Sequence, residues 1–333
     1  MDVVSFTPTP EQYAWTFGGV PAVASVQPGT VLKLWSEDAF AGRITSRDQR
    51  PSQILDTRRL NPQTGPFHVT GAEPGDTLAL HFVDIQPARD WAASATLPFF
   101  GALTGSERTA TLQASLPERV WIYEVDRVAR TARFAAGTGD FTVDLPLDPM
   151  LGTVGVAPAL REVRTSLAPD THGGNLDTPE LRPGTTIYLG VNVPGALFSI
   201  GDGHYRQGEG ESCGTALEGA MNSTVIVELI KGGAPAWPRI ESDTHLMTVG
   251  SARPLEDAWR SGQVEMVRWV AGLCGLEEMD AYQLVSQVCL SPIANVVDTN
   301  YSAVTKVAKA FLPGARAYDG MHAHLRQVAA TVR

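Results

Sequence analysis

Two polar clusters in the middle of the chain contain residue types that could do chemistry. The first is His172-Gly-Gly-Asn-Leu-Asp177, and the second is Gly201-Asp-Gly-His204, which continues to Gln207-Gly-Glu-Gly-Glu211. In an extended segment Asp202 and His204 point to the same face, because side chains alternate along a strand. The glycines between them let the backbone turn sharply and approach a ligand closely. These two side chains could therefore meet one ion.

Histidine with carboxylates is the ligand set of Zn²⁺ or another first-row divalent ion, above all where one position stays open for water. A single Gly-Asp pair is more often a turn, and a lone histidine is more often a packed or surface residue. The density of such residues among glycines favours a site. We expect a divalent metal held by His172, Asp202 and His204, with zinc as the first choice and calcium or another divalent ion as alternatives.

A succession of longer motifs resembles a known family. The motifs are Asn61-Pro-Gln-Thr-Gly-Pro66, Leu151-Gly-Thr-Val-Gly-Val-Ala-Pro158, His172-Gly-Gly-Asn-Leu-Asp177 and the run from Gly201 to Glu211. In this order, over about residues 31 to 290, the chain is similar to the acetamidase/formamidase family. The resemblance implies a cytoplasmic hydrolase of short aliphatic amides with a β-rich fold. It also implies a homo-oligomer, and relatives with a bound divalent metal.

Amide hydrolysis needs a nucleophile, stabilisation of an oxyanion and a proton for the departing amine. A metal at the predicted site would polarise the carbonyl and lower the pKa of bound water. Glu211 is then the candidate general base, and Asp177 either orients His172 or binds the ion itself. The rival nucleophile is Cys213, as a thiolate activated by a nearby base. Against it stands the frequency of inert, buried cysteines.

Three further residues are candidates for holding the substrate or the ion. Asn61 and Asp38 lie in segments that resemble the family, although Trp35 replaces an acidic residue that the family pattern has before Asp38. Glu209 stands where the family pattern has an aspartate. A side chain one methylene longer shifts a carboxylate by about an ångström, which matters to catalysis. Substrate preference is the property that these departures affect most.

The elements that must position these residues are expected to be mostly strands. The 333 residues include 32 Gly and 23 Pro, and charged residues make up only 19%, which favours short strands and tight turns over a helical bundle. We predict an α+β, β-rich fold: an antiparallel sandwich or barrel-like body over residues 1–235 that carries the metal site, and a smaller helix-rich α/β portion over 236–333. The two parts could form one continuous domain.

Apolar spacing predicts individual elements. Alternation or short apolar runs predict strands at 31–35, 67–69, 77–83, 120–125, 132–143, 186–191, 196–200 and 224–230. Apolar stripes with helical spacing lie at 255–274, 279–290, 303–311 and 322–332. Residues 90–116 lack periodicity, which predicts a long loop or lid.

Charge and cysteine content limit the partners and the compartment. The net charge of −10 disfavours nucleic acid and anionic membranes. The most apolar stretch, 187–200, is too short to cross a bilayer, and the amino terminus does not read as a secretory signal. Three cysteines suit a reducing compartment, so we expect a cytoplasmic protein. The family resemblance implies that its small-molecule partner is an amide.

Two alternatives stay open at this point. One is a non-catalytic β-sandwich module that binds a metal or a small polar ligand. The other keeps the fold and the metal site but acts on a larger or cyclic amide, in which case residues 90–105 could cap the pocket.

Overall fold

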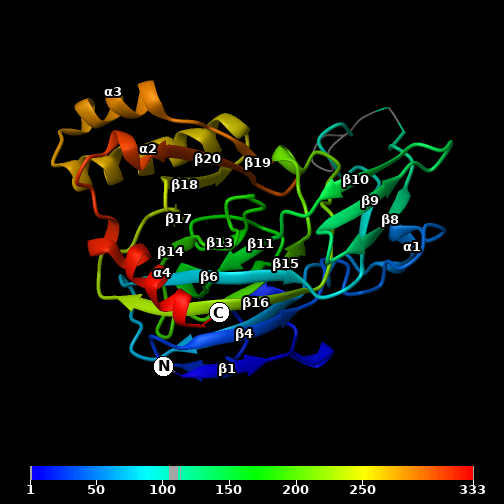
Figure 1. The fold of residues 1–333 in the computed structure, drawn as a ribbon, viewed down its shortest axis with the longest axis horizontal. Helices are drawn as coiled ribbons and strands as arrows, with labels where there is room; N and C mark the ends of the chain where they lie inside the picture. Colours follow the sequence, from blue (N-terminus) through cyan, green and yellow to red (C-terminus); the bar gives the residue numbers. More distant parts are fainter. Residues whose placement is uncertain (1, 105–111, 113, 333) are drawn as a thin grey trace.

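The computed structural model describes residues 2–104, 112 and 114–332, and its largest element is a nine-stranded sheet of order β1-β4-β16-β6-β14-β17-β18-β20-β19 (Figure 1). Its strands are β1 (Val3–Phe6), β4 (Val31–Ser36), β6 (Thr77–Pro87), β14 (Thr186–Gly190), β16 (Met221–Ile230), β17 (Arg239–Glu241), β18 (His245–Ala252), β19 (Ile293–Asn295) and β20 (Tyr301–Ala308). Only the β1–β4 pair is parallel among these described strands. The strands of this sheet come from both sides of residue 235, so the two predicted parts of the chain share it.

Three smaller sheets complete the strand structure. A five-stranded sheet has the order β13-β11-β15-β5-β3, and a four-stranded sheet has the order β10-β9-β8-β7. The strands are β3 (Ala24–Val26), β5 (Gln63–Val69), β11 (Met150–Gly155), β13 (Gly173–Asn175) and β15 (Phe198–His204) in the former, and β7 (Trp91–Thr96), β8 (Arg119–Asp126), β9 (Thr131–Ala135) and β10 (Thr142–Pro146) in the latter. Strands β2 (Thr16–Phe17) and β12 (Arg164–Thr165) form a separate pair.

The central strands of the large sheet are apolar on both faces, which explains their continuous hydrophobic runs. Leu80 and Val225 face the main core together with Phe198 of the five-stranded sheet. Their chain neighbours Ala79 and Ile226 face the other way, against the carboxy-terminal helix. The main core therefore lies between the two sheets, and helices cover the opposite face of the large sheet.

The helices are α1 (Pro51–Ile54), α2 (Leu255–Cys274), α3 (Glu278–Val288) and α4 (Met321–Val332). Helices α2 and α3 pack on β18 and β20 (Figure 1). A side-chain carbon added at Gly250 of β18 would collide with the backbone of α2 at Ala258 and Gly262, so the glycine permits a close approach of helix and strand. No helix in the described part of the chain has the length and apolar character needed to span a membrane.

The predicted β-rich fold with a helix-containing carboxy-terminal part is confirmed. The strand predicted at 132–143 is instead the antiparallel pair of β9 and β10, and two further local predictions are wrong. Residues 303–311 were expected to be helical, whereas Tyr301–Ala308 form β20. This strand buries Val304 on one face and Val307 on the other, and such doubly buried strands lack the alternation that distinguishes them from helices.

The second error concerns residues 90–116, which were expected to form a loop. They begin with strand β7, whose small buried residues Ala92, Ala93 and Ala95 pair with β8. Residues 105–111 and 113 of the expected lid lie outside the described residues.

Candidate functional site

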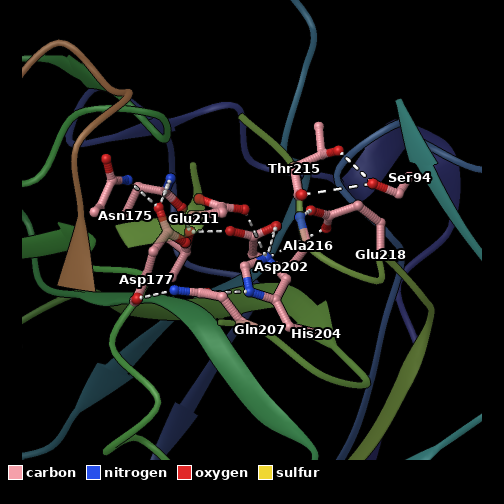
Figure 2. A network of polar contacts seen from close by, with 12 residues as sticks. Ser94, Asn175, Asp177, Asp202, His204, Gln207, Glu211, Thr215, Ala216 and Glu218 are labelled. Atoms are coloured by element: carbon pink, nitrogen blue, oxygen red, sulfur yellow. Dashed lines mark hydrogen bonds and ion pairs between the residues drawn. The ribbon is translucent and has the colours of Figure 1, made fainter. Parts of the chain in front are cut away.

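A buried cluster of one imidazole and several carboxylates lies at the end of β15 (Figure 2). Nε2 of His204 lies 3.3 Å from Oδ1 of Asp202, 3.3 Å from Oε2 of Glu218 and 4.0 Å from Oε1 of Glu211. All four side chains are buried. The structure thus brings Asp202, His204 and Glu211 together and adds Glu218.

Gln207 fixes the orientation of the His204 ring (Figure 2). Its side-chain nitrogen donates to the backbone carbonyls of Asp177 and Ala294, at 2.6 and 3.0 Å. Its side-chain oxygen therefore faces Nδ1 of His204, 2.8 Å away. Because an amide oxygen only accepts hydrogen bonds, Nδ1 carries the proton and Nε2 is the atom that faces the carboxylates.

A second layer of amides and acids adjoins this cluster. Oδ2 of Asp177 accepts hydrogen bonds from Asn175 and Asn295, and the same two amide groups donate to Asp298 at 2.6 and 2.7 Å. The other oxygen of Asp177 is buried and has no hydrogen-bond partner among the described residues. A cation or a proton donor is what such an atom needs.

Burial, together with the concentration of negative charge, shifts the pKa values of the cluster. Burial and the nearby Glu211 and Asp298 carboxylates raise the pKa of Asp177 well above its usual range. Burial likewise raises the pKa of Glu211 and of Glu218, in spite of the nearby imidazole, and it raises the pKa of Asp298 to about 7.

The two members closest to each other behave as an ion pair. Burial alone would raise the pKa of Asp202, but the His204 imidazole outweighs it and lowers that pKa. Burial alone would lower the pKa of His204, but the Glu218 and Asp202 carboxylates outweigh it and raise that pKa.

The donor set fits a divalent cation. Two groups of three side chains each bring ligand-type atoms within 4.8 Å of one another: Asp177 with His204 and Glu211, and Asp202 with His204 and Glu218. Gly152 of β11 keeps the space between them open, because a side-chain carbon there would lie 2.5 Å from Oδ1 of Asp177 and would also collide with Asp202. Oxygen atoms with one imidazole nitrogen are ligands for zinc and other divalent ions.

Backbone strain accompanies the cluster. Four non-glycine residues of the site have positive φ: Asn61 (55°), Asp177 (46°), Asp202 (61°) and Glu211 (48°). Each such residue costs on the order of 1–3 kcal/mol, and such strain concentrates at functional sites. The surrounding turns and the β11–β15 pairing hold these side chains in place.

A cavity of about 450 Å³ opens onto the cluster. Its polar lining comes from the acids and amides Asn61, Asn175, Asp202, Glu211, Glu218 and Asp298 and from the hydroxyl residues Ser52, Thr57, Thr215 and Thr299. Its apolar lining includes Phe40, Leu55, Leu60, Leu97, Phe100 and Leu167. The acidic groups thus belong to a pocket whose lining is in the larger part hydrophobic.

The remaining predicted site residues differ in their placement. Asn61 lines the cavity and donates to Thr153 and Asn175 at 2.8 and 3.0 Å. Asp38 is buried beside Glu37 and pairs with Arg89 at 2.9 Å. Glu209 and Cys213 are exposed.

The structure does not bring His172 into either ligand group. Its ring packs against Phe17 of β2, with centroids 5.1 Å apart, and burial lowers its pKa to about 4. Strand β13 separates His172 from Asp177 in the chain. Asp177, which follows this strand, reaches the cluster, whereas His172, which precedes it, does not. The placement of His172 therefore does not favour the predicted role as a metal ligand.

Sequence reasoning missed Glu218, Asp298 and the amides Asn175 and Asn295. A signal existed for Glu218, which is a single acid in the apolar run Ala216-Leu-Glu-Gly-Ala-Met221, and acids are rarely buried without a partner. Asp298 follows β19 in a polar turn of the carboxy-terminal part, and only the long-range sheet pairing brings it to the site.

The chain matches known proteins in sequence and in fold. Residues 14–161 and 157–308 match the model of the Acetamidase/Formamidase family. A putative formamidase from Schizosaccharomyces pombe is 28% identical over 262 residues, which are 64% of this chain and 63% of that protein, so the chain spans less than two thirds of that relative.

Solved structures match over nearly the whole chain. The acetamidase from Yersinia enterocolitica is 37% identical, with a TM-score of 0.87 and 94% of each chain covered. The acetamidase from Bacillus halodurans is 29% identical, with a TM-score of 0.82 and coverage of 92% of this chain and 98% of that one. The chain belongs to the acetamidase/formamidase family.

Proposed function

We propose that this protein hydrolyses the C–N bond of short aliphatic amides of the formamide and acetamide type. The oxygen of water bonds to the acyl carbon and the C–N bond breaks. Both protons of the water pass to the departing nitrogen, so the products are a carboxylate and ammonium. One observation carries the proposal in a member of this family: the buried carboxylates of Asp202, Glu211 and Glu218 line a cavity and adjoin the His204 imidazole.

Asp202, His204 and Glu218 are proposed to hold a divalent ion, with zinc as the first choice, and Glu218 takes the place that the sequence suggested for His172. A bound divalent ion would polarise the amide carbonyl and lower the pKa of water. Asp177, with its unpartnered oxygen, is the next candidate ligand.

Glu211 is proposed to take a proton from the attacking water and to deliver it to the departing nitrogen. Its carboxylate lines the cavity, and burial raises its pKa towards the working range of a general base. Asn61 is proposed to hold the substrate amide, because its side-chain oxygen accepts one hydrogen bond from Gln63 and has a second lone pair.

The thiol alternative has little support from the placement of Cys213. An exposed cysteine that does not line the cavity is poorly placed to attack a substrate held there. The Cys213→Ala variant is therefore expected to retain its rate of ammonia release, and loss of activity in that variant would favour the thiol mechanism.

Ammonia release from formamide, acetamide and propionamide tests the proposal, with metal analysis of the same preparation. We expect Glu211→Gln to lower kcat by about 100-fold or more, and the matched Glu256→Gln, an exposed acid of α2, to leave it unchanged. Bound metal without turnover of any amide would overturn the proposal in favour of a non-catalytic binding module.

Two broader proposals accompany this function. The three cysteines are unpaired thiols, which is compatible with a cytoplasmic enzyme, and the family resemblance supports a homo-oligomer. Cell fractionation and light scattering of the purified protein test these two points.

A further inference from the structure

We propose that the preferred substrates carry a larger apolar acyl group, of about six to eight carbons, as in hexanamide or phenylacetamide. This inference rests on the proposed amidase activity at the same site: formamide and acetamide remain substrates, and the larger amides are the better ones. The reaction is unchanged: water adds its oxygen to the acyl carbon, the C–N bond breaks and ammonia leaves.

The first argument is the volume of the cavity. Acetamide has four non-hydrogen atoms, and if each takes as much room as a water molecule in the liquid, roughly 30 Å³, acetamide fills roughly 120 Å³. The cavity measures about 450 Å³. Formamide or acetamide would therefore leave most of it to water, whereas hexanamide or phenylacetamide, with eight or ten non-hydrogen atoms, would fill roughly 240 to 300 Å³.

The second argument is the large apolar share of the lining. The carboxylates that could bind an amide group are close to one another, and Phe40, Leu60, Leu97 and Leu167 contribute apolar wall beside a few hydroxyl groups. Water against such walls has few hydrogen-bond partners. An apolar acyl chain displaces this water while its amide group stays beside the carboxylates.

The third argument is the exposure of the wall itself. Leu55, Leu60, Leu97, Phe100 and Leu167 are each only partly buried although they line a concavity. A substrate that covers them removes apolar surface from water, and each buried methylene then contributes roughly a threefold gain in binding. This gain is unavailable to formamide.

The three wall segments come from separate parts of the chain. Residues 39–60 include α1 and its flanking turns, residues 97–100 follow β7, and Leu167 follows β12. Changes in these connections can thus alter the acyl pocket without altering β15, which carries Asp202 and His204.

The experiment measures kcat/KM for formamide, acetamide, propionamide, butyramide, hexanamide and phenylacetamide with the full-length protein. We expect kcat/KM to rise about threefold per methylene beyond acetamide. The Leu167→Trp variant, which narrows the pocket, is expected to lower the hexanamide-to-acetamide ratio of kcat/KM by about 10-fold. The matched Leu276→Trp variant, at an exposed position after α2, should leave that ratio unchanged.

The outcomes separate this inference from the proposed function. Turnover of formamide and acetamide with a kcat/KM that falls from propionamide onwards overturns the inference and leaves the amidase proposal standing. Turnover of no amide in the series overturns both. If the hexanamide-to-acetamide ratio of kcat/KM is the same in Leu167→Trp and in the parent protein, the assignment of Leu167 to the wall of the acyl pocket is also contradicted.

Discussion

His204 can reach a cation only through Nε2, because Gln207 occupies Nδ1. The Gln207 amide is itself held by two backbone carbonyls, one on Asp177 and one on Ala294 of β19. The imidazole orientation thus depends on a residue that touches neither the carboxylates nor the cavity. Partners of this kind tune metal affinity in many proteins.

The Gln207→Leu variant tests this dependence at the scale of one residue. Loss of the acceptor for Nδ1 frees the ring to rotate and to change tautomer, so we expect metal affinity to fall about 10- to 100-fold. Competition with a chromogenic chelator measures this affinity. Gln283→Leu, at an exposed position on α3, is the control, and equal affinities in all three proteins would contradict the positioning role.

At the scale of elements, Arg89 joins the end of β4 to the connection between β6 and β7. Its guanidinium pairs with Glu37 and Asp38 at 2.8 and 2.9 Å and lies 5.8 and 5.2 Å from the ring centroids of Trp35 and Trp91. Both carboxylates are buried. Oδ1 of Asp38 also accepts the backbone N–H of Gly42, so the pair shapes the turn that carries Phe40 to the cavity wall.

Replacement of Arg89 by methionine should therefore destabilise the protein. Two buried carboxylates would be left without a cation, which costs about 3 kcal/mol or more of unfolding free energy. Urea denaturation measures the change. Arg133→Met, which breaks the exposed pair with Asp144, should cost less than about 1 kcal/mol, and similar losses in the two variants would refute the argument.

His172 connects the turn before β13 to β2 and gives the fold a pH dependence. Burial lowers its pKa from 6.5 to about 4, so between these values the unfolded chain binds the proton and the folded protein does not. Stability is therefore lost as pH falls from about 6.5 towards 4.

The His172→Leu variant removes this contribution. Between pH 8 and pH 5 the parent protein should lose about 2 kcal/mol more unfolding free energy than the variant. Urea denaturation at both pH values gives the difference. His324→Leu, on the exposed side of α4, should follow the parent profile, and a parent profile parallel to that of His172→Leu would show that the buried imidazole has no such effect.

The sequence predicts those features that depend on residues close together in the chain, and it does not predict those that depend on contacts between distant segments. The helix at 255–274 and the strand at 31–35 follow from local apolar spacing and were predicted closely. The strand at 301–308 was not predicted, because burial on both faces removes the alternation of apolar and polar residues that identifies a strand. In the site, Asp202 and His204 share one strand. Glu218 is placed by pairing with that strand and Asp298 by the turn after β19, and a local sequence pattern predicts neither placement.

At the scale of the whole molecule, the site depends on both halves of the chain. Asp177, Asp202 and Glu218 come from the part before residue 235, and Asn295 and Asp298 come from the part after it. The nine-stranded sheet holds the two parts together. Because the ligands assemble only in the folded chain, a bound ion should stabilise the whole fold rather than one loop.

Metal removal tests this coupling. An ion present at about 100 times its Kd adds about 2.7 kcal/mol to the stability of the folded state, so dialysis against a chelator should lower Tm by about 5 °C and added Zn²⁺ should restore it. Differential scanning calorimetry measures both values. The Asp202→Asn variant serves as the control, because asparagine tolerates the positive φ at this position while it removes a charged ligand. Its Tm should respond little to chelator, and a parent protein with the same Tm in chelator and in Zn²⁺ would show that the cluster is held together without an ion.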